Sequence, residues 1–263
     1  MKKNNIIIVF VFIIIILSVF IILNILSKDN KKDVKENKKE ENKMTTTIKK
    51  DDNIMEGISH NYHASIRIEK NGKIIYFDPY KIKDNVFDAD YIFITHSHYD
   101  HYDEESIKKV FNNNTKFIVT SDLESKVKNI GVSINNITVV YPNESYKVDN
   151  ILFETVPAYN ITKSYHKKSY NWVGYVVTLN NIKYYIVGDS DSTDEVKNVI
   201  CDVIFVPVGG TYTMDYEEAS KLVNTMNVKY AIPIHYSEVG TSIDAQNFIN
   251  NLNENIKGVI LNK

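Results

Sequence analysis

The sequence predicts an α/β sandwich, in which two β-sheets face each other and helices cover their outer faces. Strand-like segments in the first part of the globular region form hairpin-like, antiparallel groups. Nearer the end of the chain, strand patterns alternate more clearly with helix patterns. Residues 54–263 have an ordinary globular composition. Their number is enough for one domain with a sizeable core.

Each predicted element rests on a local pattern. Asn71-Gly72 separates two apolar segments and indicates a hairpin turn, and residues 180–182 separate a second such pair. Asp215, with Glu218 three residues later, predicts the capped start of a helix. The predicted strands cover residues 65–68, 74–77, 91–94, 116–119, 139–140, 151–156, 174–179, 183–187, 203–206 and 230–234, and the predicted helices 104–111, 216–226 and 244–253.

An apolar run precedes the globular region. Residues 6–23 carry no charge and are interrupted only by the polar Ser18. A helix of roughly 18–21 apolar residues spans the ~30 Å hydrocarbon core of a bilayer. The run is longer than the ~7–15 apolar residues of a signal peptide, and no Ala-x-Ala-like site follows it. We therefore expect residues 1–27 to form one transmembrane helix at the cell membrane, with a poorly matched signal peptide as the alternative.

Residues 28–53 are mostly Lys, Asp, Glu and Asn and contain no aromatic residue. Such a stretch cannot bury enough apolar surface to offset its ordering entropy, so it predicts a charged flexible linker. The membrane orientation stays open. Lys residues after the apolar run outnumber Lys2 and Lys3, which favours a domain inside the cell. The start of the run at Ile6 is typical of an export signal, and we expect the domain to be extracytoplasmic.

Charge and cysteine content exclude several classes of function. Residues 1–53 have 11 Lys and 7 Asp or Glu, a net charge of +4. The whole chain has a net charge of −2, so residues 54–263 carry −6. An acidic domain argues against nucleic-acid binding through a broad basic face. The single cysteine, Cys201, excludes an intrachain disulfide and a CxxC zinc cluster.

The strongest chemical signal is Thr95-His96-Ser97-His98-Tyr99-Asp100-His101, which directly follows a predicted buried strand. Three imidazoles and a carboxylate would be costly to bury without partners, whereas on a loop they can converge on a divalent cation. Zinc accepts such N and O donors at ~2.0–2.2 Å. His96 and His98 can point the same way, and Asp100 and His101 would then face a second point. A solvated His-rich loop is the alternative interpretation.

This HxHxDH pattern resembles the signature of the metallo-β-lactamase superfamily, and the resemblance covers roughly residues 55–240. Asn61-Tyr62-His63-Ala64-Ser65 is similar to the Gly-His-Ala-Ser opening of one branch, with Tyr62 in place of Gly. Further similar segments are Ile75-Tyr76-Phe77-Asp78-Pro79, Val187-Gly188-Asp189-Ser190-Asp191 and Ile232-Pro233-Ile234-His235-Tyr236. That branch includes ascorbate-phosphate lactonase-like and N-acyl-phosphatidylethanolamine phospholipase D-like hydrolases.

The resemblance implies an αββα sandwich over residues 54–263 and one or two divalent metal ions. Zinc is the expected metal, with Mn, Fe or Ni as alternatives. Asp189 would bridge both ions, and Asp100 and Asp189 would be the catalytic carboxylates around a metal-activated water. The implied metal ligands are His96 and His98 for the first ion, Asp100, His101 and His235 for the second, and Asp189 for both.

One departure from the family pattern concerns the first ion. The family usually places a third His just after a mid-chain strand, but the matching residues 156–160 contain no His. His166 follows seven residues after Tyr159. It would serve as a ligand or as a substrate-binding group, and an exposed loop His is the alternative.

For several other residues the sequence leaves a functional and a structural interpretation open. His63 would lie near the metals and interact with Asp78 or with a substrate, although a structural His is the alternative. Asp78 would orient a ligand His or cap a turn. Asp191 would point the same way as Asp189 or belong to a turn. His60 is expected to be exposed and inert.

We therefore expect a membrane-anchored hydrolase in which metal-activated water attacks an ester, lactone, amide or phosphodiester bond of a small molecule. Its expected partners are that substrate and the membrane, and no nucleic acid. The missing third His motivates an alternative: a degenerate, non-catalytic sensor domain of the same fold that binds metal or ligand without turnover.

Overall fold

The computed structural model describes residues 54–261. The chain divides into two units, residues 1–56 and residues 57–263, and the elements below belong to the second. The predicted membrane anchor and charged linker lie outside the described residues. Within residues 54–261, we find no helix that combines the length and the apolar character needed to span a bilayer.

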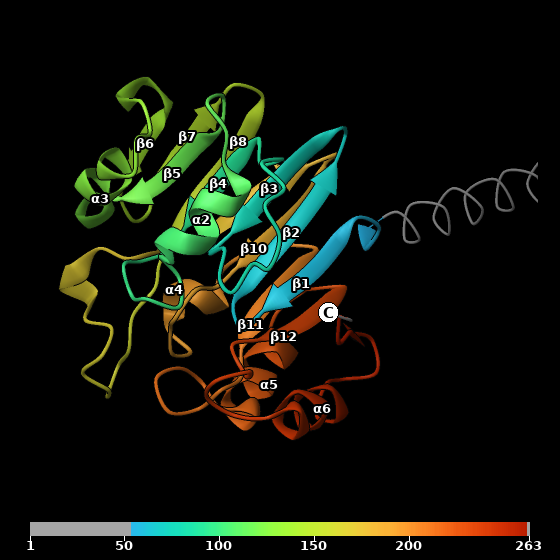
Figure 1. Ribbon diagram of the computed structural model, residues 1–263. Helices are drawn as coiled ribbons and strands as arrows, with labels where there is room; N and C mark the ends of the chain where they lie inside the picture. The colour runs from blue at the N-terminus through green and yellow to red at the C-terminus, as the bar shows by residue number, and fades with distance from the viewer. Residues whose placement is uncertain (1–53, 262–263) are drawn as a thin grey trace, which may run out of the picture. The chain divides into compact units, whose positions relative to one another are not determined.

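Two β-sheets form the centre of the second unit (Figure 1). The first has the strand order β1 (Ile58–Tyr62), β2 (Ser65–Lys70), β3 (Lys73–Phe77), β4 (Tyr91–Ile94), β5 (Lys116–Thr120) and β6 (Ile137–Val140). The second has the order β13 (Lys257–Gly258), β12 (Tyr230–Ile234), β11 (Val203–Pro207), β10 (Ile182–Ile186), β9 (Val173–Leu179), β8 (Ile151–Pro157) and β7 (Ser145–Val148).

Each sheet joins an antiparallel half to a parallel half. In the first sheet, β1, β2 and β3 pair antiparallel, and β3 to β6 pair parallel. In the second, β7 to β10 pair antiparallel, and β10 to β13 pair parallel. The C-terminal ends of parallel strands meet at one edge of a sheet, where α/β proteins commonly place their sites.

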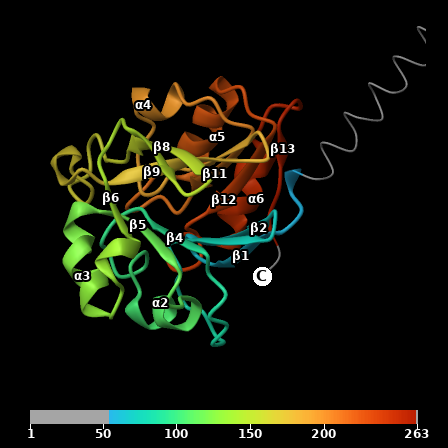
Figure 2. The ribbon, with the colours of Figure 1, turned by 90° about the horizontal axis from the view of Figure 1, so that it is seen from above.

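Helices cover the outer faces of the sheets. Figure 2 shows α2 and α3 on one side, α4, α5 and α6 on the other, and the strands between them. The α-helices are α2 (Glu104–Val110), α3 (Glu124–Asn129), α4 (Asp194–Lys197), α5 (Tyr216–Thr225) and α6 (Ser242–Asn250), and the short 3₁₀ helices are η1 (Ser121–Leu123), η2 (Ile134–Asn136) and η3 (Lys168–Tyr170). The chain therefore has the predicted αββα sandwich architecture.

Aromatic side chains join the two sheets. The ring of Phe93 on β4 lies 5.1 Å from that of Phe153 on β8 and 5.1 Å from that of Tyr175 on β9. The hydroxyl of Tyr175 donates to the carbonyl of Ile94 at 2.8 Å. Replacing a buried Phe by Ala typically costs about 3–5 kcal/mol, so these contacts hold the end of β4, where the His-rich loop begins, against the second sheet.

The hairpin predictions are confirmed by backbone geometry. Asn71 and Gly72 both have positive φ, at 54° and 67°, as a type I′ turn requires. Asn180 and Asn181 likewise have φ of 53° and 61° and link β9 to β10. The predicted capping box of Asp215 and Glu218 opens α5.

Several short elements escaped prediction. They are β1, β7, β13, α3 and α4, and none exceeds six residues. β1 reads Ile-Ser-His-Asn-Tyr, with little apolar alternation, and its pairing with β2 is set by tertiary structure. The last helix begins at Ser242 instead of residue 244, because Thr241 and Asp244 form a capping box.

Candidate metal centre

The candidate site lies where strands of both sheets end. The His-rich loop begins directly after β4, Asp189 follows β10 by three residues, and His235 directly follows β12. The candidate ligand atoms fall into small groups in which all atoms lie within 4.8 Å of one another. The two sheets therefore deliver residues from distant parts of the sequence to one place.

The first group consists of His96, His98, His166 and Asp189. The His96 Nε2 and His98 Nδ1 atoms are 3.2 Å apart. Asp189 Oδ2 lies 3.2 Å from His166 Nε2 and 3.9 Å from His96 Nε2. His166, which the sequence left undecided, is 1 % exposed and faces Asp189. It is therefore not an exposed loop residue.

Two further groups, His101 with Asp189 and His235, and His63 with Asp100 and His235, share His235, and Asp100, His101, Asp189 and His235 are together called the second group below. Asp189 Oδ1 lies 3.2 Å from His101 Nε2, and Asp189 Oδ2 lies 3.2 Å from His235 Nε2. Asp100 Oδ2 lies 3.4 Å from His235 Nε2 and 3.7 Å from His101 Nε2. Asp189 thus belongs to both groups, and one carboxylate lies between the two sets of imidazoles.

The donor atoms fit divalent cations. Buried atoms with no hydrogen-bond partner among the described residues include the Nε2 atoms of His101, His166 and His235 and the Oδ1 atom of Asp189. A buried polar atom left without a partner costs about 1–3 kcal/mol. Several such atoms directed at the same cluster are what a cation-binding site requires, and imidazole with carboxylate is a donor set that zinc accepts.

Asp78 lies behind His101. His101 Nδ1 donates to Asp78 Oδ2 at 2.7 Å. The backbone N–H and the hydroxyl of Thr95 donate to the same carboxylate at 2.8 and 2.7 Å. When a metal replaces the proton on Nε2, this hydrogen bond keeps the remaining ring proton on Nδ1, so Nε2 is the His101 atom that faces Asp189 and the second group.

His63 contacts a different carboxylate from the one expected. The sequence interpretation gave Asp78 or a substrate as its partner; its Nε2 lies 3.3 Å from Asp100 Oδ2 and not beside Asp78, and His63 also lines the pocket described below. The backbone N–H of Ser237 donates to His63 Nδ1 at 3.3 Å, so the ring proton resides on Nε2 and points to Asp100. The pairing differs because the β1–β2 turn brings His63 against His235, with ring centroids 3.8 Å apart.

Asn160 holds His166 in place. The Oδ1 of Asn160 accepts from His166 Nδ1 at 2.9 Å and from the His166 backbone N–H at 3.2 Å. The Nδ2 of Asn160 donates to Asp191 Oδ1 at 3.0 Å and to the carbonyl of Tyr212 at 2.9 Å. Because both partners of Nδ2 are acceptors, the amide orientation is fixed, and His166 Nε2 is left as the atom that faces Asp189.

Asp191 serves this loop and not the metal groups. Its carboxylate also accepts from the backbone N–H of Ile161 at 2.8 Å and from Lys163 Nζ at 3.2 Å. Asp191 was predicted either to point the same way as Asp189 or to belong to a turn, and its contacts agree with the second alternative. It anchors the segment that carries His166.

Two further residues near the site are His60, whose burial differs from the prediction, and Trp172, which contacts two of the histidines. His60 is only 2 % exposed, and its Nε2 lies 2.7 Å from the carbonyl of His63, so the prediction of an exposed residue is wrong. Trp172 packs against His96 and His98, with ring centroids at 4.7 and 4.8 Å. Its indole N–H donates to Asp122 Oδ2 at 3.0 Å. The sequence offered no signal for this contact beyond the presence of the single Trp.

Buried charges shift the ionisation of the ligand candidates. Burial alone would raise the pKa of Asp189, but the charges of His235 and His101 hold this pKa well below its usual range. Burial would lower the pKa of His235, yet the Asp189 and Asp100 carboxylates raise it to about 9. Burial lowers the pKa of His96 well below its usual value. A metal that binds at His235 therefore has to displace a proton.

A pocket of about 280 Å³ opens beside the ligand groups. Its lining residues are His63, His98, Tyr99, Asp100, Tyr165, His166, Asp189, Tyr212, Glu238 and Val239. Tyr212 belongs to the loop between β11 and α5. The pocket gives a small molecule access to both groups.

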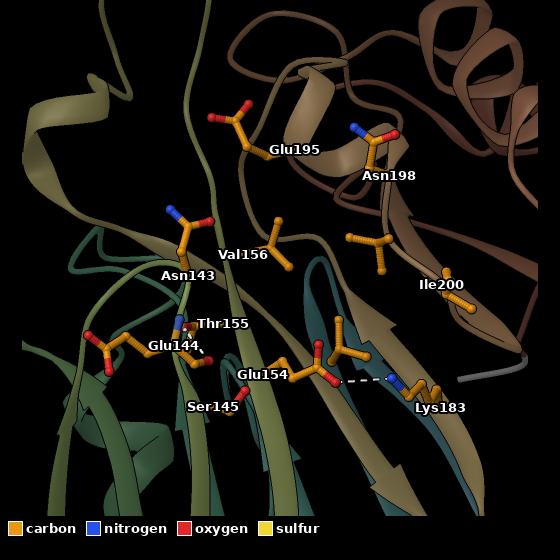
Figure 3. Close-up of a pocket in the computed structure, with 12 residues that line it drawn as sticks. Asn143, Glu144, Ser145, Glu154, Thr155, Val156, Lys183, Glu195, Asn198 and Ile200 are labelled. Carbon is orange, nitrogen blue, oxygen red and sulfur yellow. Dashed lines mark hydrogen bonds and ion pairs between the residues drawn. The ribbon is translucent and has the colours of Figure 1, made fainter.

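A second hollow of about 390 Å³ lies away from these histidines (Figure 3). It is lined by residues of β7, β8 and β10 and of the segment around α4. Lys183 reaches across it to Glu154 at 3.0 Å. None of its described lining residues is a His or an Asp. This hollow therefore offers no imidazole ligand for a metal ion.

Comparisons with known proteins agree with this site. The sequence model of the family described as "Beta-lactamase superfamily domain" matches residues 58–235, well over half of the chain. A UPF0173 metal-dependent hydrolase of Thermococcus kodakarensis is 27 % identical over 188 residues, which cover 66 % of this chain and 82 % of that protein. A UPF0173 metal-dependent hydrolase of Nanoarchaeum equitans is 29 % identical over 190 residues, covering 68 % and 83 %.

Solved structures show the same fold. A protein of Parabacteroides distasonis superposes with a TM-score of 0.65 at 25 % identity, covering 78 % of this chain and 91 % of that one. Igni18, a metallo hydrolase of Ignicoccus hospitalis, superposes with a TM-score of 0.64 at 20 % identity, covering 78 % and 94 %.

Proposed function

Because the chain belongs to the β-lactamase superfamily and its curated relatives are metal-dependent hydrolases, we propose that this metal-dependent hydrolase works with two zinc ions. The observation that carries the proposal is the position of Asp189, which is shared by two buried groups of imidazole and carboxylate ligands. Two ions a few ångströms apart typically clamp the attacking and leaving oxygens of a hydrolytic reaction.

The proposed ligands follow from the two groups. His96, His98 and His166 would hold the first ion, and Asp100, His101 and His235 the second, with Asp189 between them. His166 would take the place of the third His that residues 156–160 lack. The position of His166 supports the hydrolase over a non-catalytic sensor domain, since His166 can supply the first group with the His that this segment lacks.

The metal ions, when bound, supply Lewis acidity and lower the pKa of water to about 7. The residues of this chain orient the ligands. Asp78 keeps the His101 proton on Nδ1, and Asn160 keeps the His166 proton on Nδ1. His63 Nε2 lies 3.3 Å from Asp100 Oδ2 and so packs against a carboxylate that also lines the pocket.

The scissile bond would be an ester, lactone, amide or phosphodiester of a small molecule. The test is the purified full-length chain, loaded with zinc or manganese, assayed against one substrate of each bond type. We expect turnover of at least one substrate that needs added metal and that is abolished in Asp189→Asn. Two bound metal ions with no turnover of any substrate would instead favour a binding domain.

We also propose that residues 1–27 anchor the hydrolase in the cell membrane with the domain outside the cytoplasm. The uncharged run of residues 6–23 supports this proposal. An alkali-resistant membrane association that is lost when residues 1–27 are removed would support the anchor. Cleavage of the domain by protease added to intact cells would support the orientation, and recovery in the soluble fraction would contradict both.

A further inference from the structure

The walls of the active-site pocket are aromatic. Tyr99, Tyr165 and Tyr212 line it, and their exposed fractions are 70 %, 48 % and 37 %. Exposed tyrosines gathered at one opening offer flat apolar surface with a polar tip, which suits an aromatic or planar ligand. In addition, Tyr165 and Tyr212 meet edge to face with centroids 4.7 Å apart, so they form one wall.

This wall is held in place. The carbonyl of Tyr212 accepts from Asn160 Nδ2 at 2.9 Å, and Tyr165 directly precedes His166 in the chain. The next residue, Thr213, accepts through its carbonyl from Lys163 Nζ at 2.7 Å. A wall fixed before binding loses little conformational entropy when a ligand arrives, which favours a rigid apolar group.

A carboxylate also lines the pocket. Glu238 lines the pocket and accepts from the hydroxyls of Tyr80 and Tyr99 at 3.0 and 3.4 Å. Lys81 pairs with the same carboxylate, so this cation is already engaged, and it offsets part of the charge of Glu238. Burial would raise the pKa of Glu238, but Lys81 and Tyr80 lower it, and the carboxylate stays ionised.

The described lining residues include no Lys and no Arg. An anionic group remote from the scissile bond would therefore find no cationic partner in the pocket, and it would lie near Glu238. Recognition of phosphate or carboxylate groups normally uses such cations. The metal ions would act only at the reacting group itself.

We propose that the site takes a small substrate whose non-reacting part is an uncharged aromatic or planar group, placed against Tyr165 and Tyr212, and that Glu238 disfavours substrates with a remote negative charge. This inference rests on the proposed two-metal hydrolase and specifies its substrate class. A pocket of about 280 Å³ limits that group to about the size of one or two rings.

The test uses three hydroxamates, because this group chelates zinc and reports binding without turnover. Acetohydroxamate, benzohydroxamate and 4-carboxybenzohydroxamate share the chelating group and differ in the ring and its remote charge. Affinities are measured by calorimetry on the zinc-loaded full-length chain. We expect benzohydroxamate to bind about tenfold tighter than acetohydroxamate, since one ring contact has an effect of this size. We expect it to bind several-fold tighter than 4-carboxybenzohydroxamate, because Lys81 offsets part of the like charge of Glu238.

Two variants separate the effect of the tyrosine wall on probe binding from the effect of the Glu238 charge. Tyr212→Ala should remove most of the preference for benzohydroxamate over acetohydroxamate, and Glu238→Gln should reduce the penalty of the 4-carboxy group several-fold. Equal binding of all three probes, or tightest binding of the 4-carboxy probe, would overturn the proposal.

Metal analysis of the same samples distinguishes the failure of this inference from the failure of the proposed function. Chains that hold zinc but do not prefer the neutral ring contradict the substrate class only. Chains that hold no zinc contradict the two-metal function, and the substrate class with it.

Discussion

The two ligand groups share Asp189 but are held in different ways. Around the second group, the backbone itself is constrained, because its member His235 has a positive φ of 61°, and Asp78 and His63, which contact its members, have φ of 44° and 55°. Left-handed backbone at such residues costs about 1–3 kcal/mol each and persists only where the surroundings enforce it. In the first group, His166 comes from a long loop and depends on one amide side chain, that of Asn160. The same fold therefore positions the ligands of the second group mainly through the ends of its strands, and His166 of the first group through the hydrogen bonds of Asn160.

Asp189→Asn should have the largest effect, because this is the residue that the two groups have in common. The amide keeps the size of the side chain but removes the charge that both sets of imidazoles face. We expect both metal ions to be lost and kcat/KM to fall by more than the ~10–100-fold typical of residues behind the ligands. Metal content and kinetics check this. Retention of two ions in the variant would contradict a shared carboxylate.

His166→Ala and His235→Ala should separate the two groups. Each variant removes one imidazole that faces a different side of Asp189, so we expect each to lose one ion and keep the other. Metal content, followed while a chelator is added, measures this. If His166→Ala retains the full wild-type metal content, His166 is not a ligand, and the first group is incomplete.

Sequence reasoning found the second group more fully than the first for a physical reason. Asp100, His101, Asp189 and His235 follow predicted strands within a few residues, and strand ends in a sandwich are placed by the sheets themselves. The position of His166 depends on hydrogen bonds among Asn160, Asp191 and Tyr212, which lie up to 52 residues apart. The pairing of His63 with Asp100 likewise depends on tertiary contacts that no local pattern encodes.

The strands and long helices were predictable because they carry apolar periodicity or clear capping signals. The short edge strands β1 and β7 and the one-turn helix α4 carry little of either. They form because the neighbouring strands and the sheet surface provide partners. The metal identity stays a prediction, since imidazole and carboxylate ligands suit several divalent metals.

Asn160→Ala should weaken the first group without removing a ligand. The variant takes away the acceptor that fixes the His166 proton on Nδ1 and leaves Asp191 without one of its donors. Loss of such an orienting residue typically lowers metal affinity ~10–100-fold. We expect the affinity of one ion to fall and that of the other to stay unchanged, measured by chelator competition. Asn113→Ala, at an exposed loop position, is the matched control.

His63→Asn should have the smallest effect of these five site variants, and on the second group only. Asn tolerates the left-handed backbone of this position, so the change removes the ring and its contact with Asp100 without adding backbone strain. The contact is long, at 3.3 Å, and Asp100 also lies against His235, so the carboxylate keeps part of its restraint. We expect a loss of about tenfold or less in kcat/KM, with the affinity of the first ion unchanged. A larger loss than that of Asn160→Ala would mean that the second group depends on hydrogen bonds as much as the first, and that its strained strand ends do not make it the more rigid of the two.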